Sequence, residues 1–297
     1  MKKTVLITGC SIGGLGNALA YEFLKVGYHV IATARDTKKI GPLANKSDVD
    51  IFQLDVTLPE SISHCLSKIQ AMEIKLDILV NNAGCASFNP LVHADVNAAK
   101  ALYDVNVWGS LRVTQAFIPL LLSSQGVILN IASMAGAVPL AWQGKCLRQF
   151  TTLSLTPLDT GIYNSSKAAM TFISETLKIE LEPLGVRVVT AMVGAINTEI
   201  YDGCDVVLPT DSWYKPIEDT IRRQAKGEMQ LPNNEAVEVT AASIVKDTLS
   251  GRRGKIWRGG EAGIASIGSW LFPTWLVESI LHKNRGLSTL RKAHRQM

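Results

Sequence analysis

Six apolar runs of strand length recur along the first two thirds of the chain, with stretches of helical character between them. Strands that are covered on both faces read as continuous apolar runs, whereas strands with one wet face alternate apolar and polar residues. The runs therefore predict an α/β fold with a doubly wound parallel sheet of the Rossmann type. The predicted strands are Thr4–Ile7, His29–Ala34, Ile51–Leu54, Leu76–Val80, Gly126–Ile131 and Arg187–Met192.

The length of 297 residues suits one large core with an appendage better than two equal domains. We expect a single domain over residues 1–255 and an apolar and basic C-terminal extension over residues 256–297. Helices over Ile217–Gln230 and from near Asn234 to Gly251 are expected to border the substrate side of the cleft.

A glycine-rich turn follows the first predicted strand and leads into a predicted helix over Asn17–Val26. Glycines let the backbone approach a pyrophosphate, and a helix N-terminus offers N–H donors and a favourable dipole. A turn of this kind also occurs without a ligand, so the loop alone leaves both interpretations open. The candidate dinucleotide contacts are Gly9, Ser11, Ile12, Gly14 and Gly16.

Residues at the ends of the next three strands indicate which dinucleotide would bind. Arg35 follows the second run, where an acidic residue would hold a ribose 2′-hydroxyl, and can instead pair with a 2′-phosphate. This favours NADP(H), with a solvated arginine beside Asp36 as the alternative. Asp55 could accept a hydrogen bond from adenine, unless it caps a helix, and Asn82 could line the adenosine ribose.

Four polar residues form a second constellation. Tyr163 and Lys167 are four positions apart, which places a phenol and an ammonium on one face of a helix, and Asn106 and Ser133 precede them. With the glycine loop and an Asn-Asn-Ala-Gly segment, all in this order, roughly residues 1–200 resemble the short-chain dehydrogenase/reductase family.

The resemblance implies that the chain reduces a carbonyl group with a nicotinamide cofactor. Tyr163 would protonate the carbonyl oxygen, and Lys167 would lower the pKa of that phenol and hold the nicotinamide ribose. Ser133 would position the substrate oxygen, and Asn106 would hold a water that relays protons towards Lys167. The resemblance also implies a homo-oligomer.

The loop after the sixth predicted strand resembles the family segment that closes over the nicotinamide. The backbone of Ile196 and the hydroxyl of Thr198 would contact the carboxamide. Val193 stands where the family usually has proline, which leaves the rigidity of this loop open.

Two spacings depart from the family pattern. The glycine loop has one residue more than the commonest form, as in fungal members related to acyl-dihydroxyacetone-phosphate reductase. Ser133 and Tyr163 lie farther apart than usual, and removing Gly144–Thr160 would restore the common spacing. The segment is either a lid over the active site or a translated intron. We prefer the intron, because Gly144-Lys145 can be encoded with a donor sequence, and transcript sequencing decides between the two.

The C-terminal extension combines tryptophans with basic residues. Trp270 and Trp275 flank Pro273 in an apolar run that is too short and too interrupted to span a bilayer. This composition is typical of an interfacial membrane anchor, with a tail docked on the core or in an oligomer contact as the alternative. The basic residues are Lys283, Arg285, Arg291, Lys292 and Arg295.

The extension also resembles the C-terminus of fungal NADPH-dependent acyl-dihydroxyacetone-phosphate reductases, which act at the endoplasmic reticulum and lipid droplets. The resemblance implies a long-chain lipid ketone as substrate. Two other hypotheses stay open: a reductase of polyketide-like ketones in fungal secondary metabolism, and a catalytically silent NADP(H)-binding protein.

Net charge, cysteine spacing and the N-terminal residues bear on nucleic-acid binding, metal binding and location in the cell. A net charge of +4 without a basic run before the last residues argues against a nucleic-acid partner. The five cysteines are scattered, so no metal site is expected. Met1 leads almost directly into the first apolar run, with no room for a cleaved signal, and a cytosol-facing core is expected.

Overall fold

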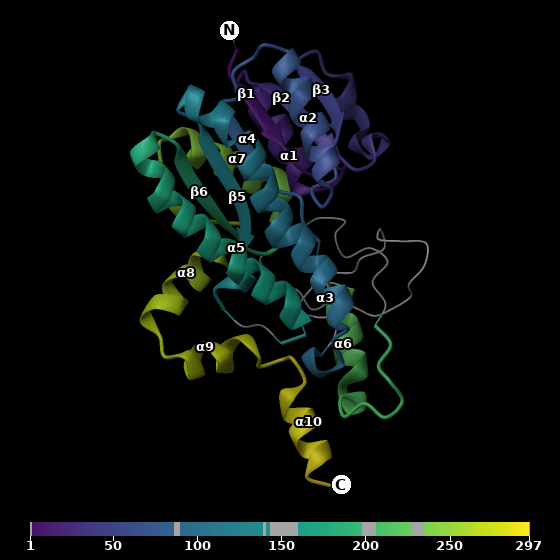
Figure 1. The fold of residues 1–297 in the computed structure, drawn as a ribbon. Coiled ribbons are helices and arrows are strands. Elements are labelled where there is room, and N and C mark those ends of the chain that lie inside the picture. Colours follow the sequence, from purple (N-terminus) through teal and green to yellow (C-terminus); the bar gives the residue numbers. More distant parts are fainter. Residues whose placement is uncertain are drawn as a thin grey trace.

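The structure is a computed structural model that describes residues 2–85, 90–138, 141–142, 160–197, 206–226, 228 and 234–296. Seven parallel strands form its central sheet, in the order β3-β2-β1-β4-β5-β6-β9 (Figure 1). The predicted doubly wound parallel sheet is confirmed. The strands are β1 (Thr4–Ile7), β2 (His29–Ala34), β3 (Val49–Gln53), β4 (Ile78–Asn81), β5 (Val127–Ser133), β6 (Arg187–Val193) and β9 (Gly254–Arg258).

Strand β9 was not among the predicted runs, and it lies across the expected boundary between residues 255 and 256. It pairs in parallel with β6 from Val189↔Gly254 to Val193↔Arg258. Residues 254–258 are therefore the edge of the sheet, and the helices of the C-terminal extension begin after them.

Helices cover both faces of the sheet, as predicted. Two of them, α1 (Leu15–Lys25) and α7 (Val237–Leu249), pack on one face. Three others pack on the opposite face, namely α2 (Pro59–Ala71), α4 (Ser110–Ser124) and α5 (Thr160–Leu181) (Figure 1).

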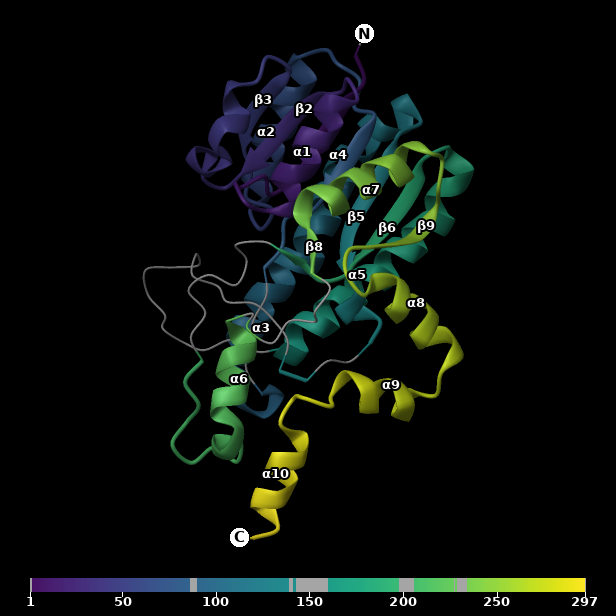
Figure 2. The same ribbon diagram turned by 180° about the vertical axis from the view of Figure 1, so that it is seen from behind.

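Further elements lie beyond the carboxyl ends of the strands (Figure 2). They are helices α3 (Val96–Tyr103), α6 (Glu218–Ala225), α8 (Ala262–Leu271), α9 (Thr274–Leu281) and α10 (Leu287–His294), and the short pair β7 (Ile196–Asn197) and β8 (Glu235–Ala236). Helices α6 and α7 occupy the two stretches that were predicted as helical, with shorter bounds.

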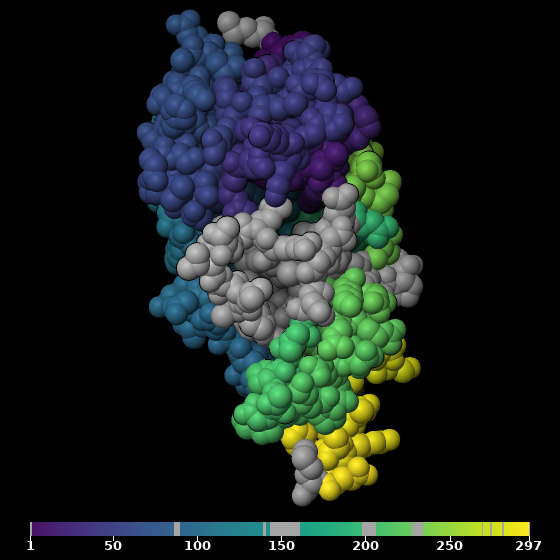
Figure 3. Space-filling model, turned by 90° about the vertical axis from the view of Figure 1, so that its right-hand side faces the viewer, coloured from purple at the N-terminus to yellow at the C-terminus, as the bar shows by residue number. Residues whose placement is uncertain are grey.

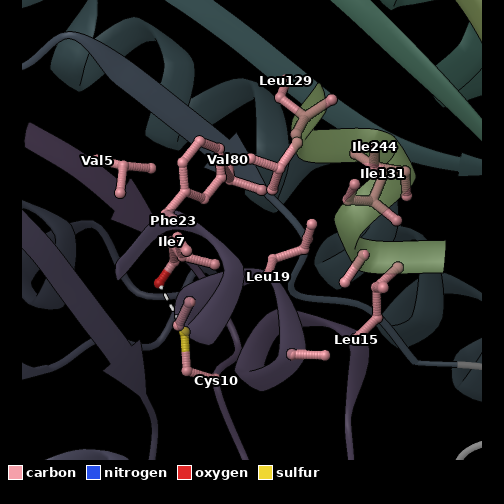
Figure 4. Close-up of a cluster of buried hydrophobic side chains, with 14 of the residues drawn as sticks. Val5, Ile7, Cys10, Leu15, Leu19, Phe23, Val80, Leu129, Ile131 and Ile244 are labelled. Atoms are coloured by element: carbon pink, nitrogen blue, oxygen red, sulfur yellow. Dashed lines mark hydrogen bonds between the residues drawn. The ribbon is translucent and has the colours of Figure 1, made fainter. Parts of the chain in front are cut away.

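The core between α1, α7 and the sheet is built from fully buried apolar side chains (Figure 4). Phe23 of α1 and Ile7 of β1 have no exposed surface. Cys10 lies beside them and donates a weak hydrogen bond from Sγ to the carbonyl of Ile7, 3.4 Å away. Burial raises the pKa of the Cys10 thiol to about 12, so this cysteine is a small apolar core residue at neutral pH.

The other face of the sheet contains a chain of buried polar side chains. Asn81 Nδ2 donates to Asn130 Oδ1 at 2.8 Å, and Asn130 Nδ2 donates to Ser174 Oγ at 2.8 Å. Ser174 Oγ is also 2.7 Å from Thr190 Oγ1. Because buried polar groups are costly unless they are paired, these bonds fix α5 in one position against β4, β5 and β6.

The C-terminal extension docks on the substrate side of the molecule. The indole nitrogen of Trp142 donates to the carbonyl of Arg285 at 2.9 Å, and the guanidinium of Arg285 donates to the carbonyl of Ala141. The N–H of Ala141 donates to Nε2 of His282 at 3.1 Å. Figure 3 shows the surface of the segment over 206–226 directly beside the C-terminal residues.

This docking corrects one expectation about the extension. Arg285 was expected among the basic residues of a lipid-facing tail. Its side chain is instead buried, and its guanidinium donates a hydrogen bond to the carbonyl of Ala141. No described helix is both long enough and apolar enough to span a bilayer.

The packing of Phe23 gives a test of the core. We expect Phe23→Ala to lower the free energy of unfolding by about 3–5 kcal/mol, because it removes a fully buried ring and leaves a cavity. Urea denaturation followed by circular dichroism measures this, with Val26→Ala, at a half-exposed position one turn later, as the control. A loss below about 1 kcal/mol for Phe23→Ala would contradict the packing described here.

Candidate active site

The turns after β1 and β4 are joined at the carboxyl edge of the sheet, where the strand order reverses. Thr8 Oγ1 accepts the N–H groups of Asn82 and Ala83 at 3.0 and 2.9 Å. Asn82 Nδ2 donates to the carbonyls of Thr8 and Gly9 at 2.8 and 2.9 Å. Open α/β sheets bind ligands in the crevice at this reversal point, so these bonds shape its floor.

The glycine loop has no room for side chains where it approaches Asn82. Gly9 has a φ of +74°, in the left-handed region. A Cβ on Gly16 would lie 2.4 Å from both the carbonyl oxygen of Gly9 and Nδ2 of Asn82. Gly14 is the N-cap of α1, and no side-chain hydrogen bond closes that cap. The bare backbone and the helix N-terminus fit the pyrophosphate of a dinucleotide.

Ser11 and Ile12 lie at the tip of the same loop. The carbonyl of Ser11 accepts the N–H of Gly14 at 3.1 Å, and the N–H of Ile12 donates to the carbonyl of Lys39 at 2.8 Å. The side chain of Ile12 is 52% exposed. Backbone bonds therefore set the shape of the tip, and the Ile12 side chain lies over Gly41, where an added Cβ would be 3.1 Å from its Cδ1.

The predicted adenosine-side residues lie at the same edge of the sheet. Arg35 is half-buried directly after β2, and Asp36 caps the next turn by accepting the N–H of Lys38 at 3.1 Å. Asp55 Oδ1 accepts from the N–H and the hydroxyl of Thr57, at 2.9 and 2.7 Å. Asp55 is therefore not the cap of α2, whose N-cap is Leu58 without a side-chain bond; its Oδ1 is instead used in a local turn with Thr57.

Lys167 and Tyr163 lie on α5 beside the carboxyl end of β5. Lys167 is 7% exposed, and its Nζ donates to the carbonyl of Ile131 at 2.9 Å. The same nitrogen is 5.9 Å from the centre of the Tyr163 ring. Burial lowers the pKa of Lys167 to about 8, an effect that the nearby Cys85 partly opposes.

Asn106 connects the turn after β4 to α5. Its Oδ1 accepts the N–H of Cys85 at 2.7 Å, and its Nδ2 donates to the carbonyl of Cys85 at 2.7 Å and to Ser166 Oγ at 3.0 Å. It lies in a π-helical turn, Asp104–Gly109, which joins α3 to α4. The structure thus uses both amide hydrogens of Asn106 to brace the site, and the proton-relaying water stays a prediction.

Ser133 ends β5, next to the loop that follows β6. Its hydroxyl accepts the N–H of Ala135 at 3.2 Å and lies 3.4 Å from the carbonyl of Val193. The N–H of Gly194 donates to the carbonyl of Arg258 at 2.8 Å, which ties the loop to the end of β9. This backbone bond fixes the start of the loop at Gly194, directly after Val193, which stands where the family usually has proline.

Two predicted features of this region can be located only in part. Ile196 lies in β7 and packs against the core on the α1 side of the sheet. Thr198 lies outside the described residues. Residues 144–159, which belong to the segment expected to be a lid or a translated intron, also lie outside them.

An apolar wall beside Tyr163 was not predicted from the sequence. The ring packs in a cluster around Met134, Ala135 and Val138, together with Trp257, Ala265 of α8 and Val277 of α9. The C-terminal extension thus contributes to the apolar surroundings of Tyr163. Within the described residues, no group of His, Cys, Asp or Glu is arranged to hold a metal ion.

The buried ammonium of Lys167 predicts a pH-dependent stability. Its pKa is about 8 in the folded chain and 10.5 ordinarily, so between these values the unfolded chain binds more protons and the folded state gains stability as pH rises. We expect the free energy of unfolding of the wild type, relative to Lys167→Met, to increase by roughly 2–3 kcal/mol from pH 8 to 10.5. Urea denaturation across this range measures the change, with the exposed-site variant Lys39→Met as baseline. A difference that stays constant or shrinks would contradict the buried ammonium.

The sequence is similar to those of known short-chain dehydrogenases. A family model described as short chain dehydrogenase matches residues 3–145. The short-chain dehydrogenase cctT of Talaromyces islandicus is 42% identical over 93% of this chain and 91% of that protein. The NADPH-dependent 1-acyldihydroxyacetone phosphate reductase of Schizosaccharomyces pombe is 34% identical over 72% of this chain and 69% of that protein.

A solved structure has the same fold. It is a short-chain dehydrogenase from Burkholderia cenocepacia in complex with NADP, with a TM-score of 0.71 and 24% sequence identity, and the match covers 94% of this chain and 97% of that one. The fold, the order of the site residues and the relatives at 42% and 34% identity lead to one conclusion. The chain belongs to the short-chain dehydrogenase/reductase family and is an oxidoreductase.

Proposed function

We propose that this protein uses NADPH to reduce an apolar ketone to a secondary alcohol, with a lipid carbonyl such as 1-acyldihydroxyacetone phosphate as the leading substrate. The observation that carries the proposal is the position of Tyr163. Its ring lies beside the buried ammonium of Lys167 and against an apolar wall that includes Ala265 and Val277. A proton donor and an apolar surface therefore meet at one place.

The proposed cofactor fits the glycine cradle and the end of β2. Arg35 directly follows β2 and is proposed to bind the 2′-phosphate, and the last residue of β2 is Ala34 rather than an acidic residue. The relative from Schizosaccharomyces pombe is named as NADPH-dependent, and the Burkholderia cenocepacia structure holds NADP. When bound, NADPH supplies the hydride. The residues proposed to hold it are Gly9, Ser11, Ile12, Gly14, Gly16, Arg35, Asp55, Asn82, Tyr163, Lys167, Ile196 and Thr198.

The side chains of the site have distinct roles in this proposal. The hydroxyl of Ser133 holds the carbonyl oxygen of the ketone, and the phenol of Tyr163 gives its proton to that oxygen. The ammonium of Lys167 stabilises the phenolate that remains, because opposite charges in a buried site attract strongly. Asn106 keeps the turn at Cys85 in place against α5, so that the site does not have to rearrange during the reaction.

The substrate class rests on the apolar wall and on one relative. The relative from Schizosaccharomyces pombe is named as a reductase of 1-acyldihydroxyacetone phosphate, a lipid ketone. The relative cctT from Talaromyces islandicus is named only as a short-chain dehydrogenase. A polyketide-like ketone is the second candidate, because the apolar wall would also accept a cyclic or aromatic substrate. A lipid substrate would place the protein at the endoplasmic reticulum or at lipid droplets, and a homo-oligomer is part of the proposal.

The decisive test measures NADPH consumption by the purified protein with palmitoyl- or hexadecyl-dihydroxyacetone phosphate. We expect turnover in the wild type and a loss of at least about 100-fold in Tyr163→Phe, because the phenol donates the proton. NADPH binding, followed by cofactor fluorescence, should persist in the variant.

The controls separate the competing hypotheses. A version that lacks Gly144–Thr160 is assayed alongside, and turnover by either version supports the lipid-ketone proposal. If only polyketide-like ketones are reduced, the second candidate replaces it. If NADPH binds and no ketone is reduced by either version, the reductase proposal is wrong and the silent binding protein is favoured.

The choice between the two nicotinamide cofactors depends on Arg35. We expect Arg35→Leu to weaken NADPH binding by about 10-fold or more and to change NADH binding little, because only NADPH carries the 2′-phosphate. Titration calorimetry with both cofactors measures this. Lys46→Ala removes an equal charge at the exposed end of the following turn and serves as the control. An equal loss for both cofactors in Arg35→Leu would show that the residue has only a structural role.

A further inference from the structure

The outer surface of α8 and α9 carries a patch of apolar side chains that the proposed chemistry does not use. Trp270 is 85% exposed and Trp275 is 68% exposed, on either side of Pro273. Contiguous apolar patches are uncommon on monomeric soluble proteins and usually mark an interaction site. The patch consists of Ile264, Ile267, Trp270, Leu271, Phe272, Trp275 and Ile280.

The opposite side of the same two helices faces the catalytic region. Ala262 at the start of α8 is fully buried, and Ala265 packs with Val277 in the cluster that holds the Tyr163 ring. Figure 2 shows α8 and α9 at the outer edge of the fold, following β9. Helices α8 and α9 therefore carry the exposed patch and also contribute to the apolar cluster on which Tyr163 packs.

Charge on the extension identifies the kind of surface that the patch fits. Four basic side chains that follow the patch are exposed, and residues 262–297 contain a single acidic residue, Glu278. Lysine and arginine in the segment that follows exposed apolar side chains attract an anionic lipid surface. The exposed basic residues are Lys283, Arg291, Lys292 and Arg295.

The residue types and the backbone also suit a lipid surface. Tryptophan favours the boundary between lipid and water, because its ring is apolar and its N–H needs a polar partner. The turn between the helices keeps its backbone hydrogen bonds, with Phe272 donating to Gly268 at 3.2 Å and Leu276 donating to Pro273 at 3.0 Å. Few backbone groups would thus lose hydrogen bonds on entering the headgroup region.

We propose that the outer face of α8 and α9 binds the surface of an anionic phospholipid bilayer, with Trp270 and Trp275 at the level of the headgroups. The apolar ketone would then reach the wall at Ala265 and Val277 from the lipid phase. This second part rests on the proposed function, whereas the binding itself does not.

Vesicle sedimentation of the full chain tests the proposal. The probes are vesicles of phosphatidylcholine alone and vesicles with 30% phosphatidylserine, in line with the role of anionic lipid. We expect binding to the anionic vesicles at least about five-fold stronger than to the neutral ones, weaker at high salt, and reduced about 10-fold or more in Trp270→Ser/Trp275→Ser. The double variant Val26→Ser/Leu249→Ser, at exposed apolar positions at the ends of α1 and α7, should bind like the wild type.

Each outcome has a defined meaning. Absence of wild-type binding, or equal binding by Trp270→Ser/Trp275→Ser, overturns the proposal. Light scattering that shows a dimer which only this variant loses, without vesicle binding, assigns the patch to a second copy of the chain and also overturns it. Turnover of a short water-soluble ketone should be the same in the wild type and the variant, so a failed reductase and a failed membrane surface give different results.

Discussion

The attachment of α5 to the sheet is the constraint on which the rest of the site depends. Asn130 binds Ser174 on one side of the β5 backbone, and the next residue, Ile131, accepts the ammonium of Lys167 through its carbonyl. A shift of α5 along the sheet would break both contacts and leave buried polar groups without partners. Tyr163 is carried by the same helix, so the bonds that stabilise the fold also orient its phenol.

Two other parts of the chain complete the site around this helix. The turns after β1 and β4, joined through Thr8 and Asn82, form the backbone cradle for a dinucleotide. The C-terminal extension returns to this side of the sheet, where Ala265 of α8 and Val277 of α9 pack on the same apolar cluster as Tyr163, and Arg285 donates to the carbonyl of Ala141. The sheet and α5 thus carry the polar site residues, and the C-terminal extension adds Ala265 and Val277 to the apolar cluster around Tyr163.

Six of the seven strands of the central sheet were predictable from the sequence, because strands buried on both faces leave continuous apolar runs. β9 was missed since an edge strand is only partly buried, and Gly254–Arg258 includes the polar residues Lys255 and Arg258. The buried role of Arg285 depends on a carbonyl far away in the sequence, and no local pattern reports such a contact. The wall on Tyr163 was missed for the same reason, and the intron or lid hypothesis stays a prediction.

The most direct test of hydride transfer from NADPH to a ketone follows hydrogen from cofactor to product. Purified protein is given NADPH that carries deuterium at the transferable position of the nicotinamide, together with palmitoyl-dihydroxyacetone phosphate, and the product is examined by mass spectrometry and NMR. We expect one deuterium on the new carbinol carbon, because NADPH donates the hydride, and we expect product formation to be lost in Tyr163→Phe. Product without deuterium at that carbon, or equal product from the variant, would contradict this expectation.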